Sequence, residues 1–132
     1  MSDATYERGV QIRQEIFGKE ATDAQLANAD DFTSMIQDLV TRYCFGEVWG
    51  RELLSRKLRS MLTIAMLAAL GRDNEIRVHV RGALANGVSR DEIGEVLLHA
   101  AIYAGVPAGA SGFRCAAEVF AEIDAAEAGA AS

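Results

Sequence analysis

The chain has 132 residues, half of them apolar, with a single proline and 7% aromatic residues. That length suits one domain with a hydrophobic core, and the composition favours helices over strands. The net charge of −6 argues against nucleic acid as a partner, because such binding depends on neutralising phosphates. No apolar run is long enough to cross a bilayer. Because Cys44 and Cys115 stand alone, we expect a cytoplasmic protein without a disulfide framework or membrane contact.

The first half of the chain begins with two segments of helical apolar periodicity. The first should cover residues 3–17 and end at Gly18. The second begins at about Asp31 and gives out in the segment CFGEVWG, residues 44–50. Two glycines there indicate a turn or a broken helix end.

The third expected helix follows Ser55, which suits the N-cap position, and ends at Gly71. Its centre, residues 61–70, is almost entirely apolar. A helix that is apolar on every side is either buried all round or partly exposed on the monomer and covered by another subunit.

The second half of the chain carries the end signals of three more helices. The segment SRDE, residues 89–92, is a capping box. Asn86–Gly87 and Gly105 are typical helix stops, and Pro107 suits a first helical turn. The expected helices cover residues 73–86, 90–104 and 107–123.

These elements predict an all-α fold, a compact single-domain bundle of about six helices over residues 1–132. Its core should cover about residues 5–124, and the tail at 125–132 should fray. The sequence shows neither an internal repeat nor a strand pattern.

His79 is the first residue that could carry chemistry. It lies at the edge of an apolar stripe on its helix, and Glu75 stands one turn before it, close enough to bond the ring and favour imidazolium. Arg77 and Arg81 point to other sides of the helix. A lone histidine at an apolar edge is more often structural, but the carboxylate neighbour and the cationic surroundings make a catalytic role about equally consistent.

The charge of the chain is unevenly placed. Eight of its 13 lysines and arginines lie between residues 51 and 90. A cationic middle in an acidic protein suggests a small anionic ligand, although solvated helix faces would explain it too.

The second histidine, His99, has Glu95 and Tyr103 at i±4. This pattern could be a proton relay, but a polar helix face is the favoured interpretation. Two histidines 20 residues apart, without a nearby cysteine or paired carboxylate, do not indicate a metal, and none is expected. The segment GVSRDEIGEVLLHA resembles part of a helix-turn-helix. This signal is weak, and the negative net charge of the chain argues against DNA binding.

Several longer segments carry a family resemblance. TRYCFGEVWGR, RSMLTIAMLAALGR, EIRVHVRGALANGVSRDEIGEVLLHAAIYAGVPAG and FRCAAEVFAE resemble the carboxymuconolactone decarboxylase family, over about residues 5–124. The broader group has the all-helical alkyl hydroperoxidase D-like fold, and its redox members carry a CxxC motif followed by a histidine. His79 matches that histidine, while Arg72 and Glu75 hold the cysteine positions, so dithiol chemistry is not expected here.

The resemblance implies a carboxy-lyase of the β-ketoadipate pathway for protocatechuate degradation. Its substrate would be 4-carboxymuconolactone, a dicarboxylate lactone that loses CO2 to give the β-ketoadipate enol-lactone. No cofactor is needed, because the electrons left by CO2 can run through the ring double bond into the lactone carbonyl. By the same resemblance, His79 would donate the proton, Glu75 or Glu47 would orient it, and Ser60 would donate a hydrogen bond into the pocket.

The resemblance also implies four substrate-binding residues. Arg59, or Arg81 if its side chain turns inward, would bind the carboxylate that stays, since a guanidinium binds carboxylates with two hydrogen bonds. Trp49 would close the pocket, although an ordinary core or interface anchor is an equally good interpretation. Tyr103 completes this set.

Other interpretations stay open. The chain could act on a different lactone or β-keto acid, could be an accessory protein of the alkyl hydroperoxidase-like group without CxxC, or could be a helical interaction module. Relatives of this group form rings of dimers, often hexamers, which implies a homo-oligomer here and a pocket that a neighbouring subunit could complete.

Overall fold

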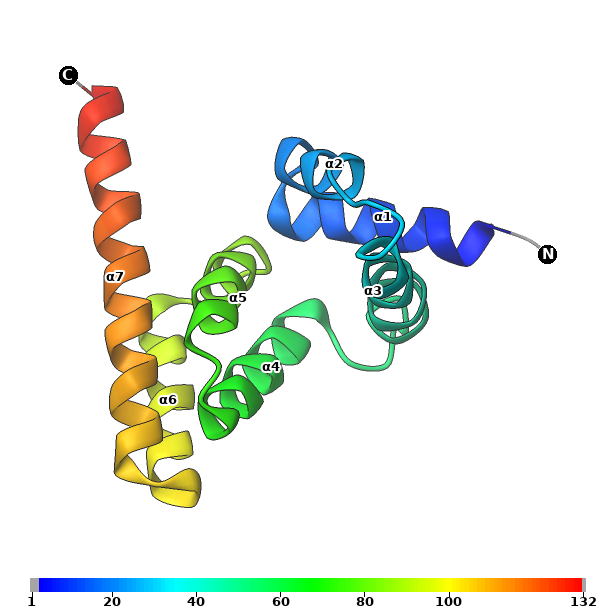
Figure 1. Ribbon diagram of the computed structural model, residues 1–132. Coiled ribbons are helices and arrows are strands. Elements are labelled where there is room, and N and C mark those ends of the chain that lie inside the picture. Colours follow the sequence, from blue (N-terminus) through cyan, green and yellow to red (C-terminus); the bar gives the residue numbers. More distant parts are fainter. Residues whose placement is uncertain (1–2, 132) are drawn as a thin grey trace. The chain divides into compact units, whose positions relative to one another are not determined.

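The structure, a computed structural model, describes residues 3–131 and is all-α, as predicted (Figure 1). Within these residues it has seven α-helices and one π-helix, and no strand. They are α1 (Ala4–Phe17), α2 (Lys19–Ala27), α3 (Ser34–Leu39), the π-helix η1 (Val40–Val48), α4 (Arg56–Leu70), α5 (Asp73–Ala85), α6 (Arg90–Ala104) and α7 (Val106–Ala131). None of these helices combines the length and the apolarity that crossing a membrane requires.

The chain divides into two compact units, an N-terminal unit that ends at Arg56 and a C-terminal unit that begins at Lys57. Each has its own apolar cluster. The single domain over residues 1–132 stays a prediction.

In the N-terminal unit, α1 and η1 cross at very short range. A Cβ atom at Gly9 would lie 1.8 Å from the backbone oxygen of Thr41, and one at Gly46 would lie 2.3 Å from that of Thr5. Only glycine therefore fits at these two positions. The close approach brings Ile12 onto the aromatic cluster of the unit, which consists of Phe17, Phe45 and Trp49.

A buried arginine holds the helices of this unit together. Arg13 is only 5% exposed, and its guanidinium donates hydrogen bonds of 2.8–3.0 Å to Gln25, Gln37 and Thr41. These acceptors are uncharged, and burial lowers the pKa of the guanidinium. Because a buried donor without a partner is costly, the network ties α1 to α2, α3 and η1 in one arrangement.

Two elements of the N-terminal unit differ from the sequence prediction. The turn predicted for residues 44–50 is wrong for its first part, because η1 continues as a π-helix to Val48 and the N–H of Trp49 still bonds the carbonyl of Cys44 at 2.9 Å. Helix α2 was not predicted. It buries only Thr22, so its sequence carries almost no apolar periodicity.

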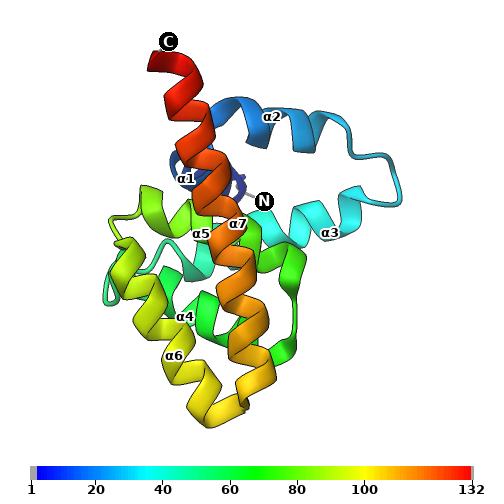
Figure 2. The ribbon, with the colours of Figure 1, turned by 90° about the vertical axis from the view of Figure 1, so that its left-hand side faces the viewer.

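In the C-terminal unit, α5 and α6 both pack against the long helix α7 (Figure 2). Glycines allow close contact between α6 and α7, since a Cβ at Gly109 would lie 2.3 Å from that of Ala101. The buried cluster contains Ile64, Ala68, Ile76, Val80, Ala83, Val88, Ile93, Leu97, Ala100, Cys115, Ala116 and Val119.

Most helix boundaries of this unit are as predicted. The Ser89–Glu92 capping box starts α6, and Gly87 turns the chain with a φ of 88° after α5. Helix α7, however, runs past the predicted end near Ile123 to Ala131. The segment predicted to fray is thus helical up to Ala131, because alanine has the highest helix propensity; Ser132 lies outside the described residues.

The close crossing of α1 and η1 predicts that a side chain at Gly9 destabilises the protein. Gly9→Ala should lower the free energy of unfolding by about 1–3 kcal/mol or more, because the new methyl group meets backbone atoms that cannot move aside. Chemical denaturation measures this change. The matched control is Gly129→Ala on α7, where a Cβ meets nothing within 4 Å and alanine should be neutral or slightly stabilising. Equal effects of the two substitutions would contradict the close crossing.

Candidate functional site

His79 lies on α5, at the edge of the stripe by which this helix enters the core. Ile76, Val80 and Ala83 of that stripe are completely buried, whereas the ring of His79 is half-buried. This is the position that the spacing of apolar residues predicts. An imidazole at such an edge is partly shielded from bulk water.

Two effects act on the protonation of His79. Burial lowers its pKa below the ordinary value of 6.5, and the negative charge of Glu75, one turn earlier on α5, raises it. Burial is the larger effect. The sequence therefore gives the direction of the Glu75 effect correctly, but the net result is a ring that is predominantly neutral at pH 7 before any ligand binds.

Most cations of the basic middle of the chain are paired. Arg77, Arg81 and Arg90 form ion pairs of 2.7–2.8 Å with carboxylates of α7, namely Glu118, Glu122 and Asp124. Lys57 pairs with Glu92, and Arg56 with Glu15. These pairs connect helices and neutralise charge, so five of the eight cations serve the fold.

Arg51, Arg59 and Arg72 are the three that make no ion pair within residues 3–131. Arg59 is half-buried on α4. Its Nε atom is completely buried and has no hydrogen-bond partner in the described part of the chain. Because nearly all buried donors in proteins are satisfied, this N–H distinguishes Arg59 from the paired cations.

Ser60, the neighbour of Arg59, is 1% exposed, and its Oγ accepts a hydrogen bond of 2.9 Å from Nδ2 of Asn86. This bond fastens the start of α4 to the end of α5. Asn86 follows His79 by seven residues, which is about 10 Å along a helix axis. Arg59 and Ser60 are therefore near one end of α5, and His79 is near its middle.

Tyr103 and His99 stack on each other on α6, with ring centroids 4.8 Å apart. The side chain of His99 is exposed, so the polar helix face favoured for it is what the structure has. Tyr103 is 81% exposed.

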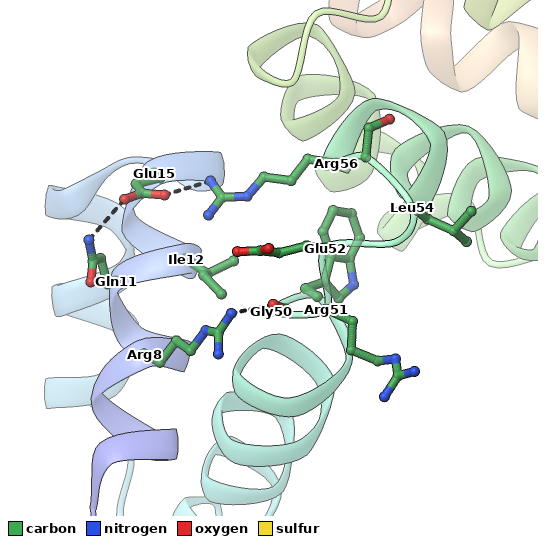
Figure 3. Close-up of a pocket in the computed structure, with 11 residues that line it drawn as sticks. Arg8, Gln11, Ile12, Glu15, Gly50, Arg51, Glu52, Leu54 and Arg56 are labelled. Atoms are coloured by element: carbon green, nitrogen blue, oxygen red, sulfur yellow. Dashed lines mark hydrogen bonds and ion pairs between the residues drawn. The ribbon is translucent and has the colours of Figure 1, made fainter.

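Glu47 and Trp49 belong to the N-terminal unit. Glu47 is exposed on η1, whereas Trp49 is 7% exposed, packs on Phe45 and lines a pocket of about 340 Å³. Figure 3 shows this pocket, called here the Trp49 pocket. Its walls are made of Arg8, Gln11, Ile12, Glu15, Trp49, Gly50, Arg51, Glu52, Leu54, Ser55 and Arg56.

Among the residues that line the Trp49 pocket, the sequence singles out Trp49 and places Arg51 and Arg56 in the basic middle of the chain, but it gives no sign of Arg8 and Glu15. Arg8 and Glu15 lie on α1, which the sequence presents only as an amphipathic helix. Their contacts run to Gly50 and Arg56, more than 40 residues away. Among residues 3–131, no three histidine, cysteine, aspartate or glutamate side chains come together in a way that could hold a metal ion.

The electrostatics of His79 lead to a prediction. Glu75→Gln should lower the pKa of His79 further, because it removes the charge that raises it. Titration of the ring by NMR measures both values. Asp91→Asn, which removes a carboxylate from the exposed first turn of α6, should leave the pKa of His79 unchanged. A rise of that pKa in the Glu75 variant would contradict the assignment.

Comparison with known proteins agrees with the fold. The sequence model of the carboxymuconolactone decarboxylase family matches residues 36–118. The chain is 42% identical over 118 residues to 4-carboxymuconolactone decarboxylase of Acinetobacter baylyi, covering 89% of this chain and 88% of that protein. It is 40% identical over 102 residues to nitrosuccinic acid decarboxylase of Metarhizium robertsii, covering 77% and 71%. Both names are those of carboxy-lyases, the class predicted from the sequence, and the chain belongs to the carboxymuconolactone decarboxylase family.

Proposed function

We propose that the protein decarboxylates 4-carboxymuconolactone to the β-ketoadipate enol-lactone without a cofactor. The observation that carries the proposal is the 42% identity to a 4-carboxymuconolactone decarboxylase over nearly the whole of both chains. The family match over residues 36–118 includes every residue that the sequence suggests for the site.

The substrate supplies its own electron sink. The bond between the ring carbon and its carboxylate breaks, CO2 leaves, and the electron pair runs through the ring double bond into the lactone carbonyl. The resulting dienolate takes one proton at the carbon next to that carbonyl. The protein has three tasks, which are to hold the second carboxylate, to stabilise the oxyanion and to deliver the proton.

His79 is the proposed proton donor. Its burial disfavours the imidazolium, so the ring gives up a proton readily once it has one. A substrate with two carboxylates supplies negative charge beside the ring and thereby favours the protonated form. Glu75 adds to this effect, and Glu47 is the alternative orienting residue.

Arg59 is the proposed partner of the carboxylate that stays. Its buried Nε lacks a partner within residues 3–131, whereas Arg81 is engaged by Glu122 at 2.7 Å. The Ser60 hydroxyl accepts from Asn86, and its own proton can still be donated to a ligand. Trp49 closes the pocket in this proposal, and the exposed ring of Tyr103 contributes from a neighbouring subunit.

The relative from Metarhizium robertsii suggests a second candidate, nitrosuccinic acid. In that compound, too, a carboxylate stands on a carbon next to an electron-withdrawing group, and a second carboxylate stays. The shared substrate class is a dicarboxylate with a built-in electron sink. A different lactone or β-keto acid of this class would need the same three tasks.

The test is incubation of the purified protein with each compound while CO2 release is followed, and for the lactone also the loss of ultraviolet absorbance. We expect turnover of the lactone with a kcat/KM at least tenfold above that for nitrosuccinic acid. The reverse order would assign the second candidate, and no CO2 from either would refute the proposal.

The lowered pKa of His79 predicts the dependence of turnover on pH. If the imidazolium donates the proton, kcat/KM should be constant at low pH and fall as pH rises through the pKa of the free ring, below 6.5. The kcat profile, which reports the substrate complex, should fall at a higher pH because the substrate carboxylates raise that pKa. A kcat/KM that rises with pH across this range would mean that the neutral ring acts as a base.

The two arginines should behave differently. Arg59→Gln should raise KM about tenfold or more, because a charge-assisted pair with the substrate is lost. Arg81→Gln should change KM by less than twofold, since its guanidinium is held by Glu122 on the surface of α7. Steady-state kinetics on the lactone measures both, and equal effects would contradict the assignment of Arg59.

We also propose that the chain forms a homo-oligomer through α4. Leu58, Leu62, Met66 and Leu70 recur every four residues along one side of this helix, and each is 47–70% exposed. An apolar stripe of this length is unusual on the surface of a monomer, and a second copy offers the same stripe to it. Light scattering should give a multiple of the 14.2 kDa chain mass.

The stripe can be tested directly. The double substitution Leu62→Lys and Met66→Lys should yield monomers with unchanged helix content, because both side chains face solvent within the chain. A wild-type protein that is monomeric at micromolar concentration would refute this proposal.

A further inference from the structure

The Trp49 pocket is built entirely from the N-terminal unit, between α1 and residues 49–56. Its apolar lining residues are Ile12, Leu54 and Trp49, of which Leu54 is 37% exposed and Trp49 is 7% exposed. Three arginines also line the pocket, and two carboxylates. It thus offers both apolar contacts and positive charge to a small molecule.

Two of these arginines are held in place by the protein. Arg8 donates to the carbonyl of Gly50, and Arg56 donates to Glu15. The bond from Arg56 lowers the pKa of Glu15, which keeps this pair ionised. A guanidinium has five N–H groups in a rigid plane. Each arginine is therefore fixed by one contact and keeps further donors for a ligand, without the loss of side-chain entropy that a mobile arginine would suffer on binding.

Glu52 indicates where a ligand would bind. Figure 3 shows its side chain between those of Arg8 and Arg56, directed into the pocket. Its carboxylate nevertheless forms no ion pair within 4 Å of any lysine or arginine in the part of the chain that the structure describes. The guanidinium groups of Arg8 and Arg56 therefore line a space into which Glu52 is directed, and Glu52 does not pair with either of them.

We propose that the Trp49 pocket binds a small molecule that carries a carboxylate on a flat apolar body. The carboxylate is held by Arg8 and Arg56 in the space that Glu52 approaches, and the apolar body lies against Trp49, Ile12 and Leu54. Glu52 opposes binding through its like charge and so limits the affinity. The substrate of the proposed reaction falls in this class, but the inference rests on the pocket alone and does not require turnover.

The chain offers a direct readout, because Trp49 is its only tryptophan. Fluorescence of this indole, excited at its red edge, therefore reports on the Trp49 pocket, and the substitutions below tie the signal to its lining. The probes are benzoate, its uncharged analogue benzamide, and inorganic phosphate. We expect a saturable change of emission with millimolar benzoate and none with benzamide or phosphate, since the first lacks the charge and the second lacks the apolar body.

Two substitutions should shift benzoate binding in opposite directions. Arg56→Gln should weaken it at least tenfold; the protein should still fold, because the Arg56–Glu15 pair is exposed and exposed pairs contribute little to stability. Glu52→Gln should tighten it severalfold. The matched controls are Arg42→Gln and Glu20→Gln, which make the same charge changes in the same unit outside the pocket lining and should leave binding within twofold of the wild type.

The inference is overturned if benzoate leaves the emission unchanged, if benzamide changes it equally, or if the Arg56 variant binds as the wild type does. These outcomes are separate from those of the decarboxylase assay. Turnover of the lactone without benzoate binding refutes this inference alone, and benzoate binding without turnover refutes the proposed function alone.

Discussion

The ring of His79 lies where the buried stripe of α5 meets solvent, and its partial desolvation is the constraint on which the proposed chemistry depends. Desolvation lowers the pKa of the ring more than the charge of Glu75 raises it. The resting site is therefore short of the proton that a decarboxylated intermediate needs. In the proposed mechanism, a dianionic substrate reverses this balance by its own charge, so that the ring is protonated as the substrate binds.

Ion pairs distinguish the arginines that hold the helices together from the arginine proposed to bind a ligand. Arg77, Arg81 and Arg90 lie among the basic residues that suggest an anionic ligand, yet each is bound to a carboxylate of α7. Their role is to hold the long last helix against α5 and α6. Arg59 differs because one of its buried donors has no partner within residues 3–131. For this reason Arg59 is the cation that we propose for the substrate carboxylate, and its neighbour Ser60 anchors that end of α4 to α5.

Local signals in the sequence predict much of this structure. The glycine stops, the Ser89 capping box and the apolar stripe of α5 are short-range features, and each predicts its element or the position of His79 correctly. Helix α2 and the π-helical continuation of η1 escape prediction because they are stabilised by the buried network of Arg13. The partners in that network are 12–28 residues away. Long-range contacts also explain why the ion pairs of the arginines are not predicted. Arg77 and Arg81 bind carboxylates that lie 41 residues further along the chain. The guanidinium groups of the Trp49 pocket likewise depend on contacts that no local pattern contains.

The central claim is that the imidazole of His79 delivers the proton. The most direct test is kcat of His79→Ala on 4-carboxymuconolactone, with circular dichroism and the oligomeric state as checks that the fold is kept. We predict a loss of about 10²–10⁴-fold, the range of a positioned general acid, with KM changed far less. A variant that keeps its fold and loses less than tenfold in kcat would contradict the account.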